Sequence, residues 1–568
     1  MYNRILKVIK VCTALTALFM MGNIDIAISA PTSTELANTN ITEPGVRVTI
    51  PPTTQPPILS SEQNQVVQDH APRLGPDYPL LAPTAGNALT RPANAPVEDP
   101  QKKSTNAAIA ATPLDPAIFR SNLVPFLGQR SGVNEPSVDG SGKYTFLTGN
   151  WYAARSSDNG ATWTYINPYA NYTGSTDFCC DQLTAYDASR NRQYWLRQYS
   201  AHLEISNSPG NNLASWCTYK FTPAMFGITA AGANFDYNKM ALSTNYLYVT
   251  TNVYANAGYL GALVFRVSLN DQPTCGSAGF GWFGPRNTEF SNAPVNGASD
   301  TMYWGTNWMS GGTIARGTGM RVFRWADNSG TVSWFDKPID SYSFMSVNGS
   351  QRCGSATGAV LNWCQRTDSR TTGNGYIALA SLAQKSSMGS WDNDSVVGFA
   401  FNANQDTAHP KPYIRRVYFR TSDVAYLGRS ELWNPTVAFL YPDLAVNARG
   451  HVGMVWAWGG GTGANNYYPG YGFTIDDDIN QTQPWYYNYY VFGAGNACLN
   501  TSDNTRRWGD YLSIHTLNPS KLVWIASGFR MNASTNCVSG QSVPQAEVRT
   551  FVFGRLRDQQ AYIRGSAF

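Results

Sequence analysis

After about residue 113, apolar and polar positions alternate over short stretches of the chain. The segments KYTFLTG, NYLYVTTNVY, RVFRWA and EVRTFVFGRL interleave β-branched and aromatic residues with polar ones, and clusters of turn-forming residues separate them. A period of two is typical of half-buried strands, whose side chains point to alternate faces. No apolar stripe with a period of 3.6 continues beyond two or three turns, so we expect an all-β domain over residues 113–568.

Tryptophan recurs within this domain at a spacing near fifty residues. Seven of the 17 tryptophans stand where a hairpin is expected to close, with gaps of 42 to 66 residues, at Trp163, Trp216, Trp282, Trp334, Trp391, Trp433 and Trp485. Units of this length, each rich in short strands, favour the blades of a β-propeller over a β-sandwich. We therefore expect a β-propeller of six to eight four-stranded blades.

The first 112 residues have a different pattern. Residues 1–30 combine basic residues with an apolar stretch over 11–21 that is too short to cross a bilayer, which predicts a secretory signal peptide, with an uncleaved anchor as the alternative. Residues 31–112 are rich in Pro, Thr, Ser, Ala, Asn and Gln without a period, which predicts a disordered or extended linker. We expect export of the propeller domain, so that it is secreted, periplasmic or displayed at the cell surface.

Composition narrows the classes of partner. Charged residues make up 14% of the chain, against about 25% in an average soluble protein, and the formal net charge is only +4. No strong positive field is therefore present to recruit nucleic acid or an anionic membrane. No later apolar run approaches the roughly 18 residues of a membrane span, so a soluble monomer is expected.

Cysteine usage agrees with export. Removal of residues 1–30 leaves eight of the nine cysteines, and an even number in an exported chain favours disulfides. Nearness in sequence predicts three local bridges and one vicinal pair, namely Cys217–Cys275, Cys353–Cys364, Cys498–Cys537 and Cys179–Cys180. Free buried thiols are the alternative for several of them.

One turn carries a recognisable pattern. The segment RSSDNGATWTY contains Ser156, Asp158, Gly160, Thr162 and Trp163 in the arrangement S-x-D-x-G-x-T-W. We expect Asp158 to accept hydrogen bonds from the backbone of its own turn, Gly160 to adopt a positive φ, and Trp163 to pack against the blade. The pattern resembles the Asp box of the sialidase-like (BNR-repeat) β-propeller superfamily, over roughly residues 114–556. Such boxes lie at the blade periphery, so the resemblance implies a fold and leaves catalysis open.

The resemblance also implies what a sialidase would need, namely three arginines, a Tyr–Glu nucleophile pair and an Asp acid/base. The usual segment with the first arginine is missing before the first box, where Arg120 and Arg130 are the nearest candidates. Only five glutamates follow residue 113, of which Glu431 and Glu135 lie beside turn or strand-end residues. These two are the preferred glutamates for catalysis, and a structural role is the alternative.

Three further segments, DFCCDQ, YPDLAVNARGH and RRWGDY, combine charged groups with tight turns. In a propeller such groups can meet at the axial mouth, where two carboxylates can cleave a glycosidic bond. The expected catalytic residues are Asp181, Asp443, Asp510, Glu431, Tyr511 and Arg507, and the expected substrate-binding residues are Arg449, Trp508, Tyr441, Gln182 and Trp485. The alternative is that Asp443 and Asp510 cap turns and pair with arginines between blades.

Residues 465–490 are dense in Tyr and Trp, whose faces suit the apolar faces of sugars, although packing between blades explains them equally well. Asp476, Asp477 and Asp478 lie in this segment. They could bind calcium, the one cofactor that the sequence leaves open, but they lack EF-hand spacing and a solvated acidic turn is favoured. No nucleotide-binding or zinc-protease motif is present, and no metal site is assigned.

The sequence thus favours an exported propeller that binds or processes an extracellular glycan or glycoprotein, with a sialidase-like glycoside hydrolase as its enzymatic form. The alternative is a non-catalytic surface or matrix scaffold for protein interactions. An enzyme needs two carboxylates roughly 5 to 9.5 Å apart in the mouth, whereas a scaffold is expected to fill the mouth with apolar side chains.

Overall fold

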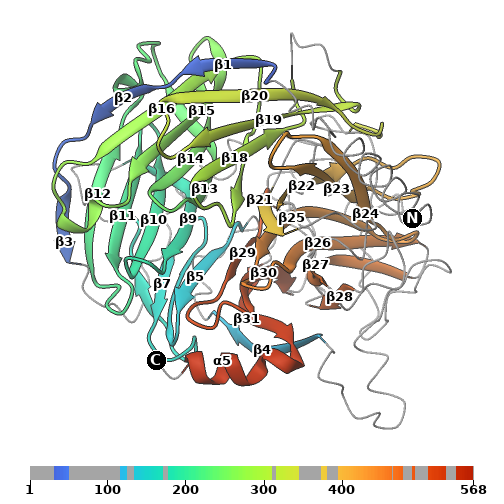
Figure 1. Ribbon diagram of the computed structural model, residues 1–568. Coiled ribbons are helices and arrows are strands. Elements are labelled where there is room, and N and C mark those ends of the chain that lie inside the picture. Colours follow the sequence, from blue (N-terminus) through green and yellow to red (C-terminus); the bar gives the residue numbers. More distant parts are fainter. Residues whose placement is uncertain are drawn as a thin grey trace, which may run out of the picture.

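The computed structural model describes residues 31–49, 116–124, 134–169, 177–309, 315–344, 373–379, 395–462, 465–477, 489–492, 509–532 and 545–566. Strands dominate these residues, and their only α-helix is the short α5 (Gln559–Ser566) near the C-terminus (Figure 1). Within the same residues no helix is long and apolar enough to cross a membrane.

The strands follow one another in antiparallel meanders of four, ordered from the inside of the molecule to its outside. The first three are β5 (Ser137–Ser141), β6 (Tyr144–Thr148), β7 (Ala153–Ser156), β8 (Thr164–Ile166); β9 (Phe178–Asp187), β10 (Arg192–Tyr199), β11 (Leu203–Pro209), β12 (Ser215–Phe221); and β13 (Asn234–Leu242), β14 (Tyr246–Ala255), β15 (Gly258–Ser268), β16 (Gly279–Arg286). The next two are β17 (Ala293–Asn296), β18 (Thr301–Thr306), β19 (Gly319–Ala326), β20 (Thr331–Pro338); and β21 (Gly375–Leu379), β22 (Ser395–Ala403), β23 (Tyr413–Arg420), β24 (Tyr426–Leu432). The last two are β25 (Ala438–Val446), β26 (Val452–Thr462), β27 (Asn465–Asp476), β28 (Tyr489–Phe492); and β29 (Ser513–Thr516), β30 (Trp524–Asn532), β31 (Gln545–Arg555), completed by β4 (Pro116–Leu123).

The innermost strands contact one another in a closed cycle, from β5 through β9, β13, β17, β21 and β25 to β29 and back to β5. The sheets therefore form a propeller-like ring around one axis (Figure 1). Five meanders are separate sheets, whereas β17–β20 and β21–β24 share one nine-stranded sheet, because β17 and β21 pair in parallel. Five meanders are thus separate blades, which differs from the six to eight blades expected, and the other two are joined through their inner strands into one further sheet.

Residues from the N-terminal side close the ring. β4 pairs antiparallel with β31, so that the outer strand of the last meander comes from more than 400 positions earlier in the chain. Hydrogen bonds between strands far apart in sequence therefore hold the first and last meanders in one ring.

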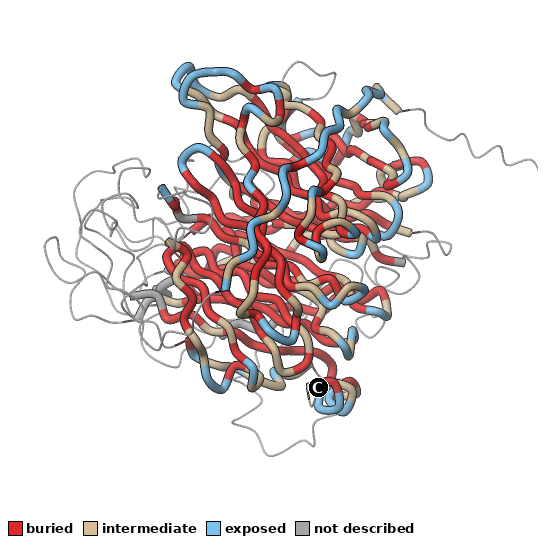
Figure 2. The backbone as a smooth tube through the Cα atoms, turned by 90° about the vertical axis from the view of Figure 1, so that its left-hand side faces the viewer, coloured by how far each residue is buried: buried red, intermediate tan, exposed pale blue. Residues whose placement is uncertain are grey.

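Residues 33–49 form a strap on the outside of the ring. β1 (Ser33–Leu36) pairs with β20, β2 (Asn38–Ile41) with β16, and β3 (Val46–Thr49) with β12. The strap is blue in Figure 1, and Figure 2 shows an exposed chain crossing the buried strands on that side. This part of the expected disordered linker is therefore ordered, because three sheet edges offer it hydrogen-bonding partners that its own composition does not reveal.

The tryptophan period follows the meanders. Trp216, Trp282 and Trp334 lie on the fourth strands β12, β16 and β20, while Trp163 precedes β8 and Trp433 follows β24. Their rings contribute to the apolar layers between neighbouring sheets, where Trp216 and Trp334 are buried. Trp391 and Trp485 lie outside the described residues.

One predicted disulfide is confirmed. Cys217 on β12 is bonded to Cys275, which follows β15, so the bridge joins the second and third meanders near the strap. The predicted bridges Cys353–Cys364 and Cys498–Cys537 lie outside the described residues, as does the side chain of Cys180.

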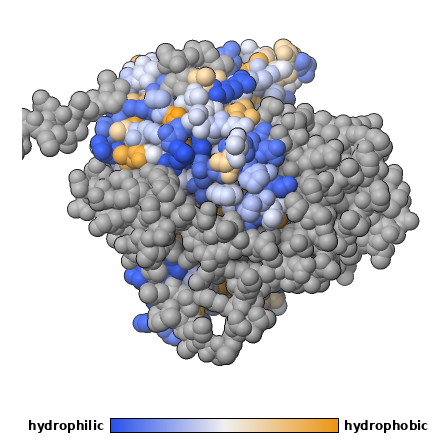
Figure 3. All heavy atoms as spheres, turned by 90° about the vertical axis from the view of Figure 1, so that its right-hand side faces the viewer, coloured by the Kyte–Doolittle hydropathy of each residue, from blue (hydrophilic) through white to orange (hydrophobic). Residues whose placement is uncertain are grey.

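The described part of the face in Figure 3 is mainly hydrophilic, with only small hydrophobic spots.

Candidate functional site

A buried lysine on an inner strand gathers carboxylates from three other meanders. Lys239 on β13 is 5% exposed, and its electrostatic neighbours are Asp443 on β25, Asp181 on β9 and Glu135 just before β5. All three carboxylates are buried as well. Because these groups come from inner strands that form one closed cycle, they converge on the axis of the ring.

Burial shifts the pKa values of this cluster. It lowers the pKa of Lys239, against the attraction of Asp443, Asp181 and Glu135. It raises the pKa of Asp443, against a backbone hydrogen bond from Asn374 and the charge of Lys239. A buried carboxyl with a raised pKa next to a cation is typical of sites that hold or transfer a proton.

Two β-bulges direct Lys239 and Asp443 toward the axis. The pairing of β13 with β14 shifts register between Asp236 and Lys239, and that of β25 with β26 shifts between Leu440 and Asp443. Tyr237 and Tyr441 within these bulges both have φ of 58°, which non-glycine residues seldom adopt. Bulges and backbone outliers of this kind re-aim side chains and are common beside functional sites.

The carboxylate of Glu135 links the first and last meanders. Its Oε2 accepts a hydrogen bond from Asn150 Nδ2 (2.7 Å), and its Oε1 accepts one from the backbone N–H of Asp510 (2.9 Å). Gly509 makes this approach possible, because its φ is 148° and a Cβ there would lie 2.8 Å from the carbonyl oxygen of Asn134. The backbone of Asp510 is thus bonded to one of the carboxylates of the cluster.

Asp443 also holds inner strands together. Its Oδ1 accepts a hydrogen bond from the backbone of Asn374 (2.8 Å), and its Oδ2 accepts one from the backbone of Ile514 (3.0 Å). A small cavity of about 30 Å³, enough for about one water, is lined by Lys239, Asp443 and Tyr511 among others. The axis is therefore narrow and largely polar at this level.

The structure brings together four of the residues expected from the sequence, namely Asp181, Asp443, Asp510 and Tyr511. Sequence reasoning missed Lys239. The available signal was a lysine inside the strand segment NFDYNKMAL, because lysine is almost never fully buried unless it is paired. Arg507, Trp508 and Trp485 lie outside the described residues.

Two of the expected substrate-binding residues, Gln182 and Tyr441, make hydrogen bonds to other groups of the protein. Gln182 is fully buried, donates from Nε2 to the carbonyl of Gly149 (2.6 Å) and accepts at Oε1 from Trp195 Nε1 (2.9 Å), so its amide joins two meanders. Tyr441 is buried at the bulge, where its backbone N–H donates to Asn402 Oδ1 (2.8 Å). Contact of these two side chains with a substrate stays a prediction.

Glu431 and Arg449, also expected at the site, form ion pairs outside the cluster around Lys239. Glu431 is on the outer strand β24, where it contacts His409 (Nε2 to Oε2, 3.2 Å), Arg415 and Arg429. These contacts outweigh burial and lower the pKa of Glu431 to about 2. Arg449, in the turn after β25, pairs with Asp558 near the C-terminus.

The acidic stretch in β27 is paired rather than solvated. Asp476 is bonded to Arg416 of β23, and Asp477 accepts two hydrogen bonds from Arg555 of β31 (2.7 and 2.8 Å). Both carboxylates are buried, because arginines of the two neighbouring meanders neutralise them. The expected solvated turn is therefore wrong for these two residues, and Asp478 lies outside the described residues.

The S-x-D-x-G-x-T-W turn has the expected local geometry. Asp158 Oδ1 accepts hydrogen bonds from the backbone of Thr162 (2.9 Å) and from Ser156 Oγ (2.7 Å), and Gly160 has φ of 76°. Trp163 packs against the largest apolar cluster. The turn connects β7 to the outer strand β8, so it stabilises a blade edge and lies apart from the axial cluster.

No protein-family model and no curated protein matches the chain. Solved structures with similar strand arrangements include a protein of unknown function from Dyadobacter fermentans (9% identity, 78% of this chain and 99% of that chain, TM-score 0.36). Others are an α-L-arabinanase of Penicillium chrysogenum in complex with arabinobiose (7% identity, 65% and 92%, TM-score 0.33) and a GH93 α-L-arabinofuranosidase of Fusarium graminearum (9% identity, 65% and 91%, TM-score 0.25). Similarity at this level transfers no activity.

Proposed function

We propose that this protein is an exported β-propeller that binds or processes an extracellular glycan at the axis of its ring. The observation that carries the proposal is the convergence of Asp181, Glu135 and Asp443 on Lys239 from four separate meanders. Burying a lysine and several carboxylates costs desolvation free energy. Apolar side chains would fill the axis of a merely structural ring without that cost. The Cys217–Cys275 disulfide fits an extracellular or periplasmic protein.

The chemistry of the cluster suits glycosidic bond cleavage. That reaction needs one carboxyl group to protonate the leaving oxygen and a second carboxylate to act as base or nucleophile. We assign these two roles to Asp181, whose charge interacts with Lys239, and to Asp510, whose backbone N–H is bonded to Glu135. Asp443 and Glu135 position the cluster, because they accept hydrogen bonds from the backbone of Asn374, Ile514 and Asp510.

The experiment is to incubate the protein without residues 1–30 with a mixed glycan library and calcium, and to search for new products by mass spectrometry. Asp181→Asn and Asp510→Asn should each abolish product formation. The thermal unfolding midpoint should stay nearly unchanged in Asp510→Asn, whose side chain is only half-buried, and fall in Asp181→Asn, because buried Lys239 loses a charge partner. The matched control is Asp300→Asn, because Asp300 is an exposed aspartate in the turn between β17 and β18. Products that persist in both axial variants would overturn the catalytic assignment.

A non-catalytic scaffold is the second candidate. The hydrogen bonds of Asp443 and Gln182 favour it, since both side chains bind protein groups and join meanders. In that case the library stays unchanged and glycan arrays retain no protein. Glycan binding without products, lost in Asp181→Asn, would instead identify a lectin.

A further inference from the structure

A second and larger cavity opens at the other end of the axis. It has a volume of about 620 Å³ and is lined by residues at the ends of the inner strands, including Tyr186, Leu242, Asn296, Ile377, Val446 and Thr516. Neighbouring inner strands run in the same direction, as the parallel pairing of β17 with β21 and the contacts of Thr184 with Ser137 and of Tyr186 with Asp139 indicate. The cavity therefore lies opposite the strand starts that carry Glu135 and Asp181.

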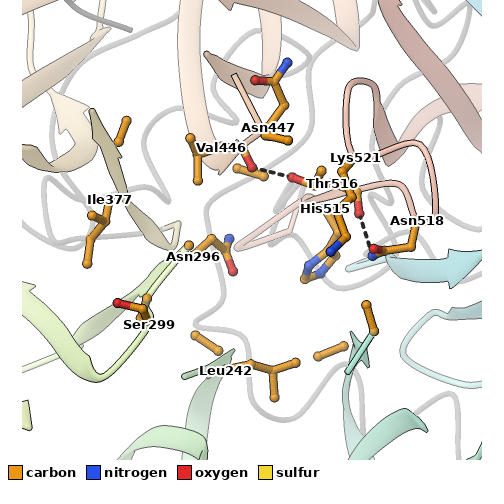
Figure 4. A pocket seen from close by; sticks show the side chains of 18 of the residues that line it. Leu242, Asn296, Ser299, Ile377, Val446, Asn447, His515, Thr516, Asn518 and Lys521 are labelled. Carbon is orange, nitrogen blue, oxygen red and sulfur yellow. Dashed lines mark hydrogen bonds between the residues drawn. The ribbon is translucent and has the colours of Figure 1, made fainter. Parts of the chain in front are cut away.

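His515, whose side chain is 13% exposed, faces this cavity (Figure 4). Its Nδ1 lies 3.5 Å from Asp139 Oδ2. The Asp139 carboxylate in turn accepts the backbone N–H groups of Gly140 (2.7 Å) and Tyr186 (2.6 Å), so it belongs to the wall. Burial lowers the pKa of His515 to about 4, so its imidazole is neutral near pH 7 and can accept a hydrogen bond.

Two amides add further acceptors. Asn296 Nδ2 donates to the carbonyl of Leu444 (2.7 Å), which leaves Asn296 Oδ1 for a ligand. Asn518 Nδ2 donates to the carbonyl of Thr516 (3.3 Å) in the same way. Figure 4 shows Asn296 and His515 pointing toward the middle of the cavity.

The rest of the lining is mixed, with aliphatic side chains, hydroxyl groups such as that of Ser299, and one cation. Leu242, Ile377 and Val446 contribute apolar wall, and the exposed Lys521 stands at the rim as a donor. A concave site with apolar walls and a few convergent polar groups is the usual form of a small-molecule site, and its volume is within the range of such sites. The acceptors Asn296 Oδ1, Asn518 Oδ1 and the His515 imidazole match a ligand that carries several hydroxyl donors on an otherwise apolar ring.

We propose that this cavity, which shares His515 with the small cavity at Lys239 and Asp443, is a second binding site for one or two units of a neutral saccharide. Ligand hydroxyls donate to Asn296 Oδ1, Asn518 Oδ1 and the imidazole of His515, and one hydroxyl oxygen accepts from Lys521. The C–H face of the sugar packs on Leu242, Ile377 and Val446. This site does not depend on the function proposed for Lys239 and its carboxylates.

The test is a titration followed by NMR of the histidine side chains in protein labelled with ¹³C-histidine. His515→Gln identifies the His515 signal, and the probes are D-galactose, D-glucose, L-arabinose and their methyl glycosides. At least one neutral sugar should shift the His515 signal in a saturable way and leave that of His202 in place. Lys521→Ala and Asn518→Ala should each weaken the apparent affinity several-fold, and the exposed Lys220→Ala on β12 should not.

Three outcomes would overturn the proposal. They are an unmoved His515 signal with every neutral sugar at tens of millimolar, an affinity unchanged in both Lys521→Ala and Asn518→Ala, and a response to D-glucuronate alone. Asp181→Asn should leave the titration unaltered. A failure here is therefore distinct from a failure of the function proposed for the axial cluster.

Discussion

At the scale of single residues, Lys239 shows how a buried charge depends on its neighbours. A lysine out of water is tolerated when carboxylates surround it, and removal of one partner leaves the others buried without compensation. Lys239 is the cation common to Asp443, Asp181 and Glu135, so its loss affects all three.

We predict that Lys239→Met lowers the free energy of unfolding at pH 7 by about 3 to 5 kcal/mol, a range typical for breaking a buried ion pair. Burial already raises the pKa of Asp443, and loss of the cation raises it further. Because the native state of the variant then binds protons more tightly than the unfolded chain, the deficit should shrink as the pH falls. Urea unfolding at pH 5 and pH 7 measures this.

The double variant Lys239→Met/Asp443→Asn separates the pair from the rest of the cluster. It should be more stable than the sum of the two single effects implies, by at least about 1 kcal/mol. Strictly additive effects would show that Lys239 and Asp443 do not interact.

His409 supports a second residue-scale prediction. Its ring nitrogens face Asp406 (Nδ1 to Oδ1, 2.8 Å) and Glu431 (Nε2 to Oε2, 3.2 Å), and it stacks on Tyr413. Burial alone would lower the pKa of His409, but the two carboxylates raise it above 6.5. The stabilisation from charged His409 is therefore complete below pH 6.5 and is lost as the pH rises through the raised value.

Glu431 determines at which low pH the same cluster loses its contribution to stability. Its pKa falls from 4.5 to about 2, so its contribution is complete above pH 4.5 and is lost as the pH falls toward 2. We predict that His409→Leu costs about 1 to 2 kcal/mol at pH 5.5 and clearly less at pH 9, measured by urea unfolding. An equal cost at both pH values would mean that packing on Tyr413, and not the charge, explains the effect.

At the scale of elements, the three strands of the strap are the elements that the sequence did not predict. Its backbone donates from Thr32, Ala37 and Thr42 to the carbonyls of Trp334 (2.7 Å), Gly330 (2.8 Å) and Ala278 (2.9 Å). Thr42 Oγ1 also accepts from the backbone of Ala278 (2.8 Å). None of these partners requires an apolar side chain, so hydropathy could not reveal the strap.

We predict that removal of residues 31–49 lowers the free energy of unfolding by at least about 2 kcal/mol, since several backbone hydrogen bonds are lost at about 1 kcal/mol each. The bare edges of β12, β16 and β20 should also promote aggregation. Thermal unfolding and light scattering measure the two effects. As a control, Glu35→Ala should cost less than about 1 kcal/mol, because the ion pair of Glu35 with Arg286 is largely exposed.

A point variant of the strap gives the same test without truncation. A Cβ on Gly45 would lie 2.4 Å from Cys217 Sγ, a distance that real contacts do not reach. Gly45→Val should therefore release β3 from β12 and expose residues 46–49 to proteases. Unchanged resistance to limited proteolysis would contradict this docking.

The other elements were largely predictable. Alternation marked most strands, and the tryptophan period followed the outer strands because large rings such as Trp216 and Trp334 fill the layers between sheets. The joining of β17 to β21 was not predictable, because a parallel pair of short inner strands leaves no pattern in either segment.

At the scale of the whole molecule, the stability of the ring depends on the strand pairing that closes it. β4 is the last strand of the sheet that begins at β29, and it comes from a segment preceding every meander. We predict that a chain starting at residue 134 loses the sharp cooperative transition of the full chain in calorimetry. A chain that lacks only 31–49 should keep a single transition at lower temperature, and loss of cooperativity there would show that the strap is also part of the closure.

The candidate site was only partly predictable for a related reason. Asp181 and Asp510 could be chosen as polar groups beside turns, yet which residues meet depends on a ring that spans the domain. Glu431 has the same local features as Glu135, but it faces outward from the fourth strand of its meander, and only the topology separates them.

The strap also changes how the N-terminal side of the chain is attached to the ring. A disordered linker over residues 31–112 would have 82 residues and could extend over roughly 270 to 300 Å. Residues 33–49 pair with three sheets and β4 pairs with β31, so the segments on both sides of residues 50–115 are fastened to the ring. Anything joined to residue 30 is therefore held within a few residues of β20. The point at which the N-terminal side of the chain meets the ring is therefore set by the pairing of three short strands, and not by the length of a linker.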